Sequence, residues 1–287
     1  MTIDYDSLRG RIFPEVVQTY GPRDVILYAL GLGLGHDPLD ANQLRHVFED
    51  GLQILPTMAV VLGHPGFWQR APDTGIHWQS VVHGEQSLVV HRPLPLSGSV
   101  RGRMVVEEIV DKGRGRGAHL HTRRDLFDDA DGALLCTLRS NAICRADGGF
   151  GGPSIVPQTA PPLPLREPDH FLDFRIPTQA ALIYRLSGDG NPLHADPAVA
   201  RLAGFERPIL HGLCTYGIAG FAIAAMVAAG DASRLCRLDA RFSAPVYPGD
   251  SLRTELWVGE PEALRFRCRV VERQVTVLDR GLAKISD

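Results

Sequence analysis

Two stretches near the end of the chain alternate between apolar and polar residues. Residues 236–242 read CRLDARF, and residues 264–270 read LRFRCRV. Successive side chains of a strand point to opposite faces, so this period of two predicts antiparallel strands with one face on a core and the other toward water.

Residues 212–229, GLCTYGIAGFAIAAMVAA, show no such alternation and carry no charge. The run reaches the lower length limit of a membrane span. A helix that is apolar all round is equally typical of a core helix enclosed by a sheet. Its Gly and Ala content, with Thr215 and Tyr216 inside it, favours the buried helix. Together with the strands, it predicts an α+β fold in which a sheet curls around a helix.

The chain divides into two halves of similar design. Residues 148–170 are rich in Pro and Gly, which oppose helix and strand, so they predict a linker between residues 1–147 and residues 171–287. Each half opens with helical sequence and closes with strands; the first helix is expected to start at Pro22. Tandem duplication of one α+β unit explains this most simply, and coincidental turn chemistry is the alternative.

Composition narrows the class of protein. The 287 residues carry a formal net charge of −3, with 44% hydrophobic and 22% charged residues, which is typical of a soluble globular protein. This balance gives no case for nucleic acid or an anionic membrane as partner. The five cysteines are odd in number and form no CxxC pair, which argues against a disulfide framework and a zinc site. We therefore expect no metal and a reducing, cytoplasmic location.

The candidate chemistry begins in residues 186–194, LSGDGNPLH. Asp189 and His194 are joined by Gly190, Asn191 and Pro192. Gly and Asn tolerate positive φ and Pro fixes φ, so this loop is expected to be a stiff turn. Two plainer interpretations stay open, since Asp189 can simply cap the turn and His194 can be a structural histidine.

Further along, Asp196 and Pro197 predict the start of a short helix that ends near Gly204. Gly212 then falls in the first turn of the long apolar helix. N–H groups there lack intrahelical partners and point toward a ligand, as in an oxyanion hole, although a packing glycine is the alternative. An acid and an imidazole can hold one water, one accepting and one donating, while this N–H polarises a carbonyl.

These motifs resemble a known family. Residues 184–205, YRLSGDGNPLHADPAVARLAGF, and 207–217, RPILHGLCTYG, are similar to the MaoC-like, (R)-specific enoyl-CoA hydratase 2 family, which includes the hydratase module of the peroxisomal multifunctional enzyme. Shorter first-half segments occur in the family's order. The resemblance implies a double hotdog fold with two antiparallel sheets, each wrapped around a central helix. It also implies a hydro-lyase that converts trans-2-enoyl-CoA reversibly to (R)-3-hydroxyacyl-CoA, with an acyl-CoA substrate, no cofactor and a homodimeric assembly.

The resemblance also implies roles for particular residues. Asp189 and His194 would hold the water, Asn191 would fix their geometry, and the N–H of Gly212 would bind the thioester oxygen. Lys112 would meet coenzyme A phosphates, or is simply a solvated loop lysine. The residues placed along the acyl-CoA site are His83, Gly84, Lys112, Gly190, Pro192, Leu193, Phe242 and Glu49, the last of these with an exposed helix-end glutamate as its alternative.

Two other functions remain open at this stage. A hotdog-type acyl-CoA thioesterase uses the same fold for different chemistry. A non-catalytic acyl-CoA-binding protein would keep the pocket without turnover. The sequence does not define the acyl group, because straight, branched and sterol-like chains all enter apolar tunnels.

Overall fold

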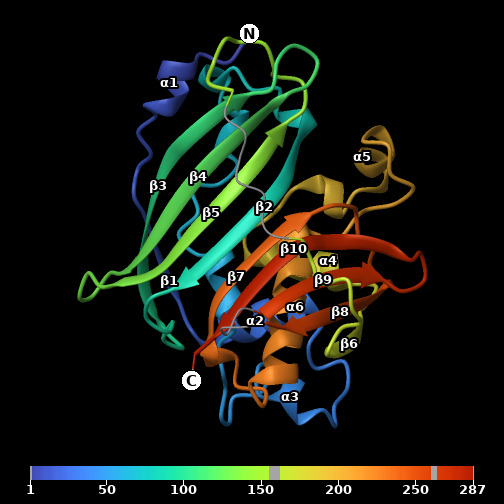
Figure 1. The fold of residues 1–287 in the computed structure, drawn as a ribbon. Helices are drawn as coiled ribbons and strands as arrows, with labels where there is room; N and C mark the ends of the chain where they lie inside the picture. Colours follow the sequence, from blue (N-terminus) through green and yellow to red (C-terminus); the bar gives the residue numbers. More distant parts are fainter. Residues whose placement is uncertain (1, 155–161, 260–263, 287) are drawn as a thin grey trace.

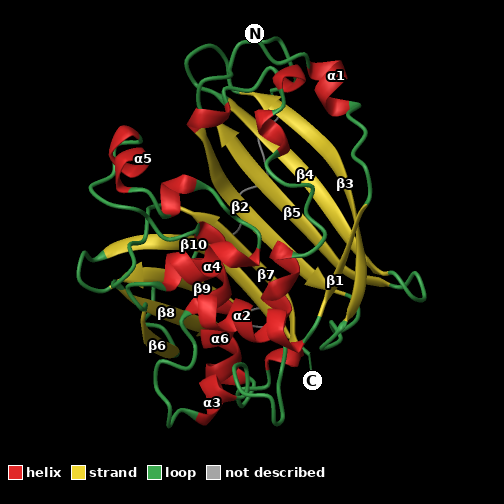
Figure 2. Ribbon diagram, turned by 180° about the vertical axis from the view of Figure 1, so that it is seen from behind, coloured by secondary structure: helices red, strands yellow, loops and turns green. Residues whose placement is uncertain are grey.

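The computed structural model describes residues 2–154, 162–259 and 264–286 (Figures 1 and 2). The helices are α1 (Tyr5–Arg9), α2 (Pro22–Leu32), α3 (Ala41–Leu44), α4 (Ala180–Tyr184), α5 (Pro197–Leu202) and α6 (Gly212–Val227). The strands are β1 (Val16–Tyr20), β2 (Val81–Val90), β3 (Gly98–Asp111), β4 (Ala118–Asp128), β5 (Leu134–Cys144), β6 (His170–Arg175), β7 (Leu235–Phe242), β8 (Ser251–Val258), β9 (Leu264–Val270) and β10 (Val275–Ile285).

The strands pair antiparallel in the order β1-β3-β4-β5-β2-β7-β10-β9-β8-β6. Five come from each half of the chain, and the halves join where β2 pairs with β7, with Gln86 opposite Ala240. The α+β double hotdog architecture is confirmed. The described strands nevertheless form one continuous sheet rather than two separate ones. The backbone N–H and C=O groups at the edge of each half are paired with those of the other half.

The predicted strand alternation is confirmed in β9. Leu264, Phe266, Cys268 and Val270 are buried, and the arginines between them are half-buried on the other face. Two of these arginines form ion pairs with Glu255 of the neighbouring strand β8. The pattern thus gave both the strand and the face that packs on the core.

Helix α6 is the centre of the second half. All residues from Cys214 to Ala224 are buried, and strands β6, β7, β8 and β10 contact the helix. Figure 1 shows the orange and red strands β7, β8 and β10 crossing over it, with the yellow-green β6 at the edge of the sheet. The expectation of a buried helix is confirmed, and no helix in the described part of the chain has the length and apolarity to cross a membrane.

The first half is arranged differently from the second. Helix α2 begins at Pro22 as expected, and it ends at Gly33 with φ of 98°. It packs on α4 and α6, at the second-half end of the molecule (Figure 2). The 3₁₀ turn Pro56–Val61 contacts β2 and β5 instead. The expected wrapping of the first sheet around its own helix is therefore replaced by a short turn and by loops.

The Pro/Gly-rich segment is fixed to the first half where it begins. The Asp111 carboxylate, at the end of β3, accepts hydrogen bonds from the N–H groups of Gly149 and Gly151 at 2.7 and 2.8 Å. Residues 155–161 of the expected linker lie outside the described residues. Its last residue, His170, is the first residue of β6.

The contact of α2 with α4 depends on Gly31. A Cβ added there would lie 2.8 Å from the Cα of Tyr184, which is closer than packed atoms approach. We expect Gly31→Ala to lower the free energy of unfolding by about 1–3 kcal/mol, since the backbone of α4 must move. Urea unfolding measures this, with Gly21→Ser as control because a Cβ at Gly21 meets nothing within 4 Å. An unchanged free energy for Gly31→Ala would contradict the packing described.

Candidate active site

The loop that carries Asp189 has a defined local structure. Oδ1 of Asp189 accepts a hydrogen bond from the N–H of Asn191 at 3.2 Å, and Oδ1 of Asn191 accepts one from Leu193 at 3.1 Å. These two side-chain turns lead into the 3₁₀ turn Pro192–His194. The expected position of the positive φ was wrong: it lies at Gly188, with φ of 124°, whereas Asn191 has φ of −57°. Asp189 does cap the turn, while its second oxygen is not engaged in these bonds.

The short helix α5 follows as predicted. Oδ1 of Asp196 accepts from the N–H groups of Ala198 and Val199, and Pro197 is the first helical residue. Gly204 has φ of 86° just after the helix. The chain then returns to the start of α6, where the N–H of Leu210 donates to the carbonyl of Val246 at 2.7 Å. This course of the chain brings the Asp189 loop, residues 189–194, next to residues 211–212 at the start of α6.

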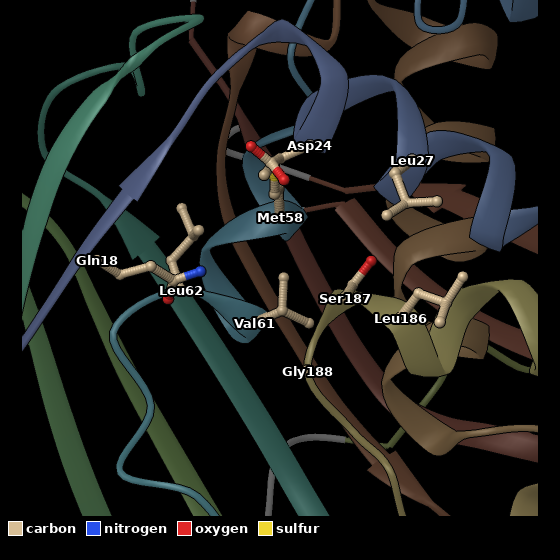
Figure 3. Close-up of a pocket in the computed structure, with 9 residues that line it drawn as sticks. All are labelled: Gln18, Asp24, Leu27, Met58, Val61, Leu62, Leu186, Ser187 and Gly188. Carbon is tan, nitrogen blue, oxygen red and sulfur yellow. The ribbon is translucent and has the colours of Figure 1, made fainter.

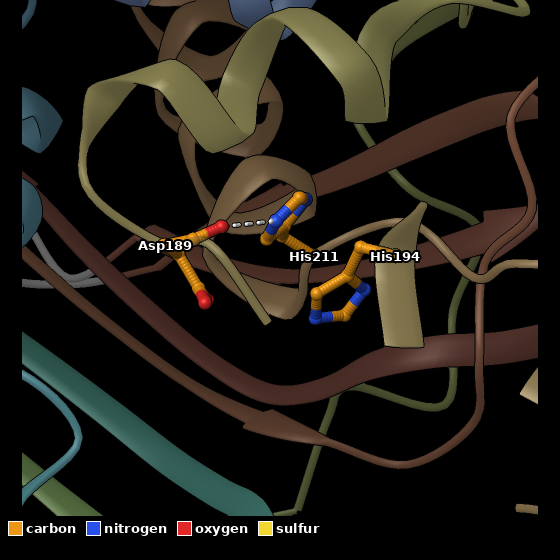
Figure 4. A group of neighbouring side chains, drawn as sticks. All are labelled: Asp189, His194 and His211. Carbon is orange, nitrogen blue, oxygen red and sulfur yellow. Dashed lines mark hydrogen bonds between the residues drawn. The ribbon is translucent and has the colours of Figure 1, made fainter. Parts of the chain in front are cut away.

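Asp189, His194 and His211 form one group of side chains (Figure 4). Their potential ligand or proton-binding atoms all lie within 4.8 Å of one another. The rings of His194 and His211 stack with centroids 3.8 Å apart and planes 30° apart. Nδ1 of His194 bonds the carbonyl of Ile209 at 2.9 Å, and Nε2 of His211 bonds the main-chain carbonyl of Asp189 at 3.2 Å.

These two bonds fix the tautomers of both rings. A carbonyl only accepts, so Nδ1 of neutral His194 carries the proton and its Nε2 presents a lone pair. The expectation that one group accepts from water and the other donates therefore changes. Neutral His194 and ionised Asp189 both accept, and a single water has two hydrogens with which to satisfy them.

Gly212 lies beside this group at the start of α6. No described residue accepts a hydrogen bond from its N–H, as expected for the first turn of a helix. A Cβ at Gly212 would lie 3.1 Å from the ring of Phe242, whose centroid is 4.7 Å from that of His83. The structure thus brings Gly212, Phe242 and His83 together near Asp189 and His194.

Three histidines beside Asp189 are held neutral at physiological pH. Burial lowers the pKa of His194, and it lowers that of His211 and of His83 to about 4. The Asp189 carboxylate opposes this shift in each of the three. His64, which is exposed, lies within electrostatic reach of the same carboxylate. Nδ1 of His64 accepts from the N–H of Gly66 at 3.1 Å.

Sequence reasoning missed His64 and His211. His211 directly precedes Gly212, so its place at the helix start was a usable signal. His64 lies in an irregular first-half loop after Gly63, and no spacing or neighbouring motif connects it with the second half. Only the tertiary fold brings it within electrostatic reach of Asp189.

The other residues predicted to line the acyl-CoA site lie at different distances from Asp189 and His194. Gly190 and Pro192 are exposed and Leu193 is half-buried on the loop itself. Gly84 follows His83 at an irregularity in the β2–β5 pairing, where a Cβ would meet Ile143 at 2.9 Å. Lys112 lies past the end of β3, at the same end of the sheet as His83 but three strands away, about 14 Å.

The structure does not bring Glu49 to this group. Glu49 is exposed and follows α3, and His46, three residues earlier, packs its ring on Phe221 at a centroid distance of 5.9 Å. Phe221 lies nine residues beyond Gly212 on α6, which corresponds to about 13 Å along the helix. Glu49 therefore lies toward the opposite end of α6 from Gly212.

A pocket of about 160 Å³ adjoins the loop on its other side (Figure 3). Gly188, the residue before Asp189, forms part of its wall, which combines five apolar side chains with the polar side chains of Gln18, Asp24 and Ser187. The residues that line it are Gln18, Asp24, Leu27, Met58, Val61, Leu62, Leu186, Ser187 and Gly188. By volume, this space could hold a short hydrocarbon segment against the apolar part of its wall.

The Asp189 group is poorly arranged for a metal ion. Imidazole lone pairs lie in the ring plane, and the planes of His194 and His211 are stacked and only 30° apart. Their lone pairs therefore run side by side and do not converge on one ion at about 2.0–2.1 Å from both. The arrangement suits proton transfer to water better than metal coordination.

The fold and this site define a MaoC-like hotdog protein. The family model described as "MaoC like domain" matches residues 157–280, and the model described as "MFE-2 hydratase 2 N-terminal domain" matches residues 18–146. The chain belongs to the MaoC-like enoyl-CoA hydratase 2 family.

Similar proteins extend over nearly the whole chain. It is 39% identical to 3-hydroxyacyl-thioester dehydratase Y of Mycobacterium tuberculosis, over 94% of this chain and 92% of that protein. It is 38% identical to the peroxisomal enoyl-CoA hydratase 2 of Arabidopsis thaliana, over 95% and 93%. The crystal structure of a MaoC-like dehydratase from Phytophthora capsici superposes with a TM-score of 0.86 at 30% identity, over 98% and 99%.

The buried histidines make stability depend on pH. His211, with an ordinary pKa of 6.5 when unfolded and about 4 when folded, binds a proton in the unfolded chain first as pH falls. The contribution of neutral His211 to the free energy of unfolding is therefore fully present above pH 6.5, and it is lost as the pH falls toward 4. We expect His211 alone to lower the free energy of unfolding by about 2 kcal/mol between pH 7.5 and pH 5. Urea unfolding at both values checks this, and His211→Phe must show the smaller fall; equal falls would contradict it.

Proposed function

We propose that this chain is a hydro-lyase that adds water across the double bond of a trans-2-enoyl-CoA and gives an (R)-3-hydroxyacyl-CoA, and that catalyses the reverse dehydration. The relatives named enoyl-CoA hydratase 2 and 3-hydroxyacyl-thioester dehydratase support this activity. The observation that carries it is the clustering of Asp189 and His194 with His211, whose neighbour Gly212 has an N–H that no described residue accepts.

In the proposed reaction, one water donates its hydrogens to Asp189 and to Nε2 of His194. As the water oxygen bonds the β-carbon, the pair takes one proton from the water and delivers that same proton to the α-carbon on the same face. The thioester oxygen gains negative charge meanwhile, and the N–H of Gly212 with the start of α6 stabilises it. Which group is the formal base is a property of the coupled pair.

The roles of Asp189 and His194 are directly testable. Asp189→Asn and His194→Gln keep size and hydrogen bonding but weaken proton transfer, so kcat should fall about 100-fold or more. The measurement is the loss of absorbance of the conjugated enoyl thioester, with His46→Phe as control because His46 is a buried histidine at the other end of α6. Near-normal hydration by either site variant would remove the assignment.

The rival chemistry gives a different signal. A thioesterase would release free coenzyme A thiol from the same substrate, and a non-catalytic binder would bind acyl-CoA without turnover. A thiol reagent followed in parallel with the enoyl absorbance separates the three. We expect absorbance loss without thiol release and an (R)-configured product by chiral analysis.

We propose that the pocket beside Gly188 receives part of the acyl chain, because five of its nine lining residues are apolar and it adjoins the Asp189 loop. Val61→Trp should fill it and lower kcat/KM for long enoyl-CoA esters about tenfold or more, with little effect on a four-carbon ester. Val17→Trp is the control, since Val17 is exposed and points away from the face of neighbouring Gln18. An equal loss for all chain lengths would contradict this acyl site.

We place coenzyme A across the end of the sheet that holds His83 and Lys112. About 14 Å across the strands separates the two residues, a span that suits the extended coenzyme A arm of the substrate rather than the reacting acyl group. A cytoplasmic, reducing location is supported by five cysteines that are all free thiols. A homodimer rests on the family resemblance, and its mass in solution tests it.

A further inference from the structure

His211 lies where three parts of the site meet. It is the residue before α6 and therefore adjoins Gly212, and only 1% of it is exposed. Its ring stacks on His194, and its Nε2 bonds the main chain of Asp189. One side chain thus contacts both members of the water-binding pair and is covalently next to the proposed oxyanion donor.

The loop around Asp189 needs such an anchor. Gly188 precedes Asp189 with φ of 124°, and Gly190 follows it, exposed and with no atom near the position of a Cβ. Glycines on both sides leave the backbone conformationally free. Oδ1 of Asp189 bonds only the local N–H of Asn191, which does not fix the loop to the rest of the fold. Among the described residues, the bond from His211 is the one that ties the Asp189 main chain to α6.

The orientation of the His194 ring also depends on a second contact. The hydrogen bond from its Nδ1 to the carbonyl of Ile209 fixes one edge of the imidazole, but the ring plane can still tilt about that edge. The stacked ring of His211, 3.8 Å away, covers one face and restricts this rotation. The direction of the Nε2 lone pair therefore depends on His211.

We propose that His211 is a positioning residue that holds Asp189 and His194 in register with Gly212. This inference rests on the proposed hydratase function, which the Asp189 and His194 variants test separately. A shift of about 1 Å between reacting groups can cost about 100-fold in rate, so such an anchor has a measurable kinetic effect.

The chemistry of His211 suits positioning rather than proton transfer. Its Nε2–H is committed to the Asp189 carbonyl, and its Nδ1 is buried with no partner among the described residues. Burial, followed by the neighbouring His194, lowers its pKa to about 4, so it is neutral near pH 7. A neutral ring beside His194 also avoids repelling the positive charge that His194 gains when it takes a proton.

The test separates the hydrogen bond from the ring contact. His211→Phe keeps a stacking ring but removes the donor, and His211→Ala removes both. We expect kcat to fall about tenfold in His211→Phe and about 100-fold in His211→Ala, with KM for the enoyl-CoA changed less than about threefold. In His211→Ala, water reaches His194, so its pKa should rise toward 6.5 and the acid limb of the rate profile should move to higher pH.

His46→Phe is the matched control. His46 is also 1% exposed, also bonds a main-chain carbonyl, that of Gln53 at 2.8 Å, and also packs beside α6. If its kcat falls as much as that of His211→Phe, or if His211→Phe and His211→Ala keep kcat within threefold of the parent chain, the positioning role is wrong. If Asp189→Asn and His194→Gln are inactive while the His211 variants are normal, only this inference fails.

A measurement on the unaltered chain keeps the proposal testable even where variants fold poorly. Nitrogen-15 NMR of the histidine rings distinguishes the tautomers. We expect the proton on Nε2 in His211 and on Nδ1 in His194 at pH 7. The Nδ1–H tautomer of His211 would leave it unable to donate to Asp189 and would overturn the proposal.

Discussion

Helix α6 has no polar face, and this constraint governs the second half of the molecule. Every side of the helix must be covered, which strands β6, β7, β8 and β10 do together with α2 and the 3₁₀ turn Pro56–Val61. Only its ends can meet polar groups. The Asp189 loop lies at the N-terminal end, where no described residue accepts a hydrogen bond from the N–H of Gly212.

The two halves of the chain contribute unequally. The second supplies the enclosed helix, the acid, the imidazole and the amide donor. The first lacks an enclosed helix, so its inner sheet face is covered by irregular segments, and these carry His64 and part of the pocket beside Gly188. The pairing of β2 with β7 joins both into one sheet and places His83 against Phe242.

Much of this arrangement was predictable because it depends on residues that are close together in the sequence. Alternation gave β7 and β9, the absence of charge gave α6, and Asp196 with Pro197 gave α5. The double hotdog itself came from family resemblance. The continuous sheet and the packing of α2 on α4 were not predictable, since they depend on contacts between residues far apart in the chain.

The same limit applied to the site. Asp189, His194 and Gly212 were found because they lie close in sequence around turn and helix signals. His211 and His64 were missed, and His194 was not expected to accept from the water together with Asp189, because each of these points depends on a carbonyl or side chain supplied by the fold. Glu49 was placed by resemblance alone, and the structure puts it toward the other end of α6.

A crystal structure of this chain with a bound (R)-3-hydroxyacyl-CoA is the most direct test of the proposed site. We expect the thioester oxygen about 2.7–3.1 Å from the amide nitrogen of Gly212, and the 3-hydroxyl within hydrogen-bond distance of both Asp189 and Nε2 of His194. A thioester bound away from the start of α6, or a 3-hydroxyl that touches neither side chain, would contradict it.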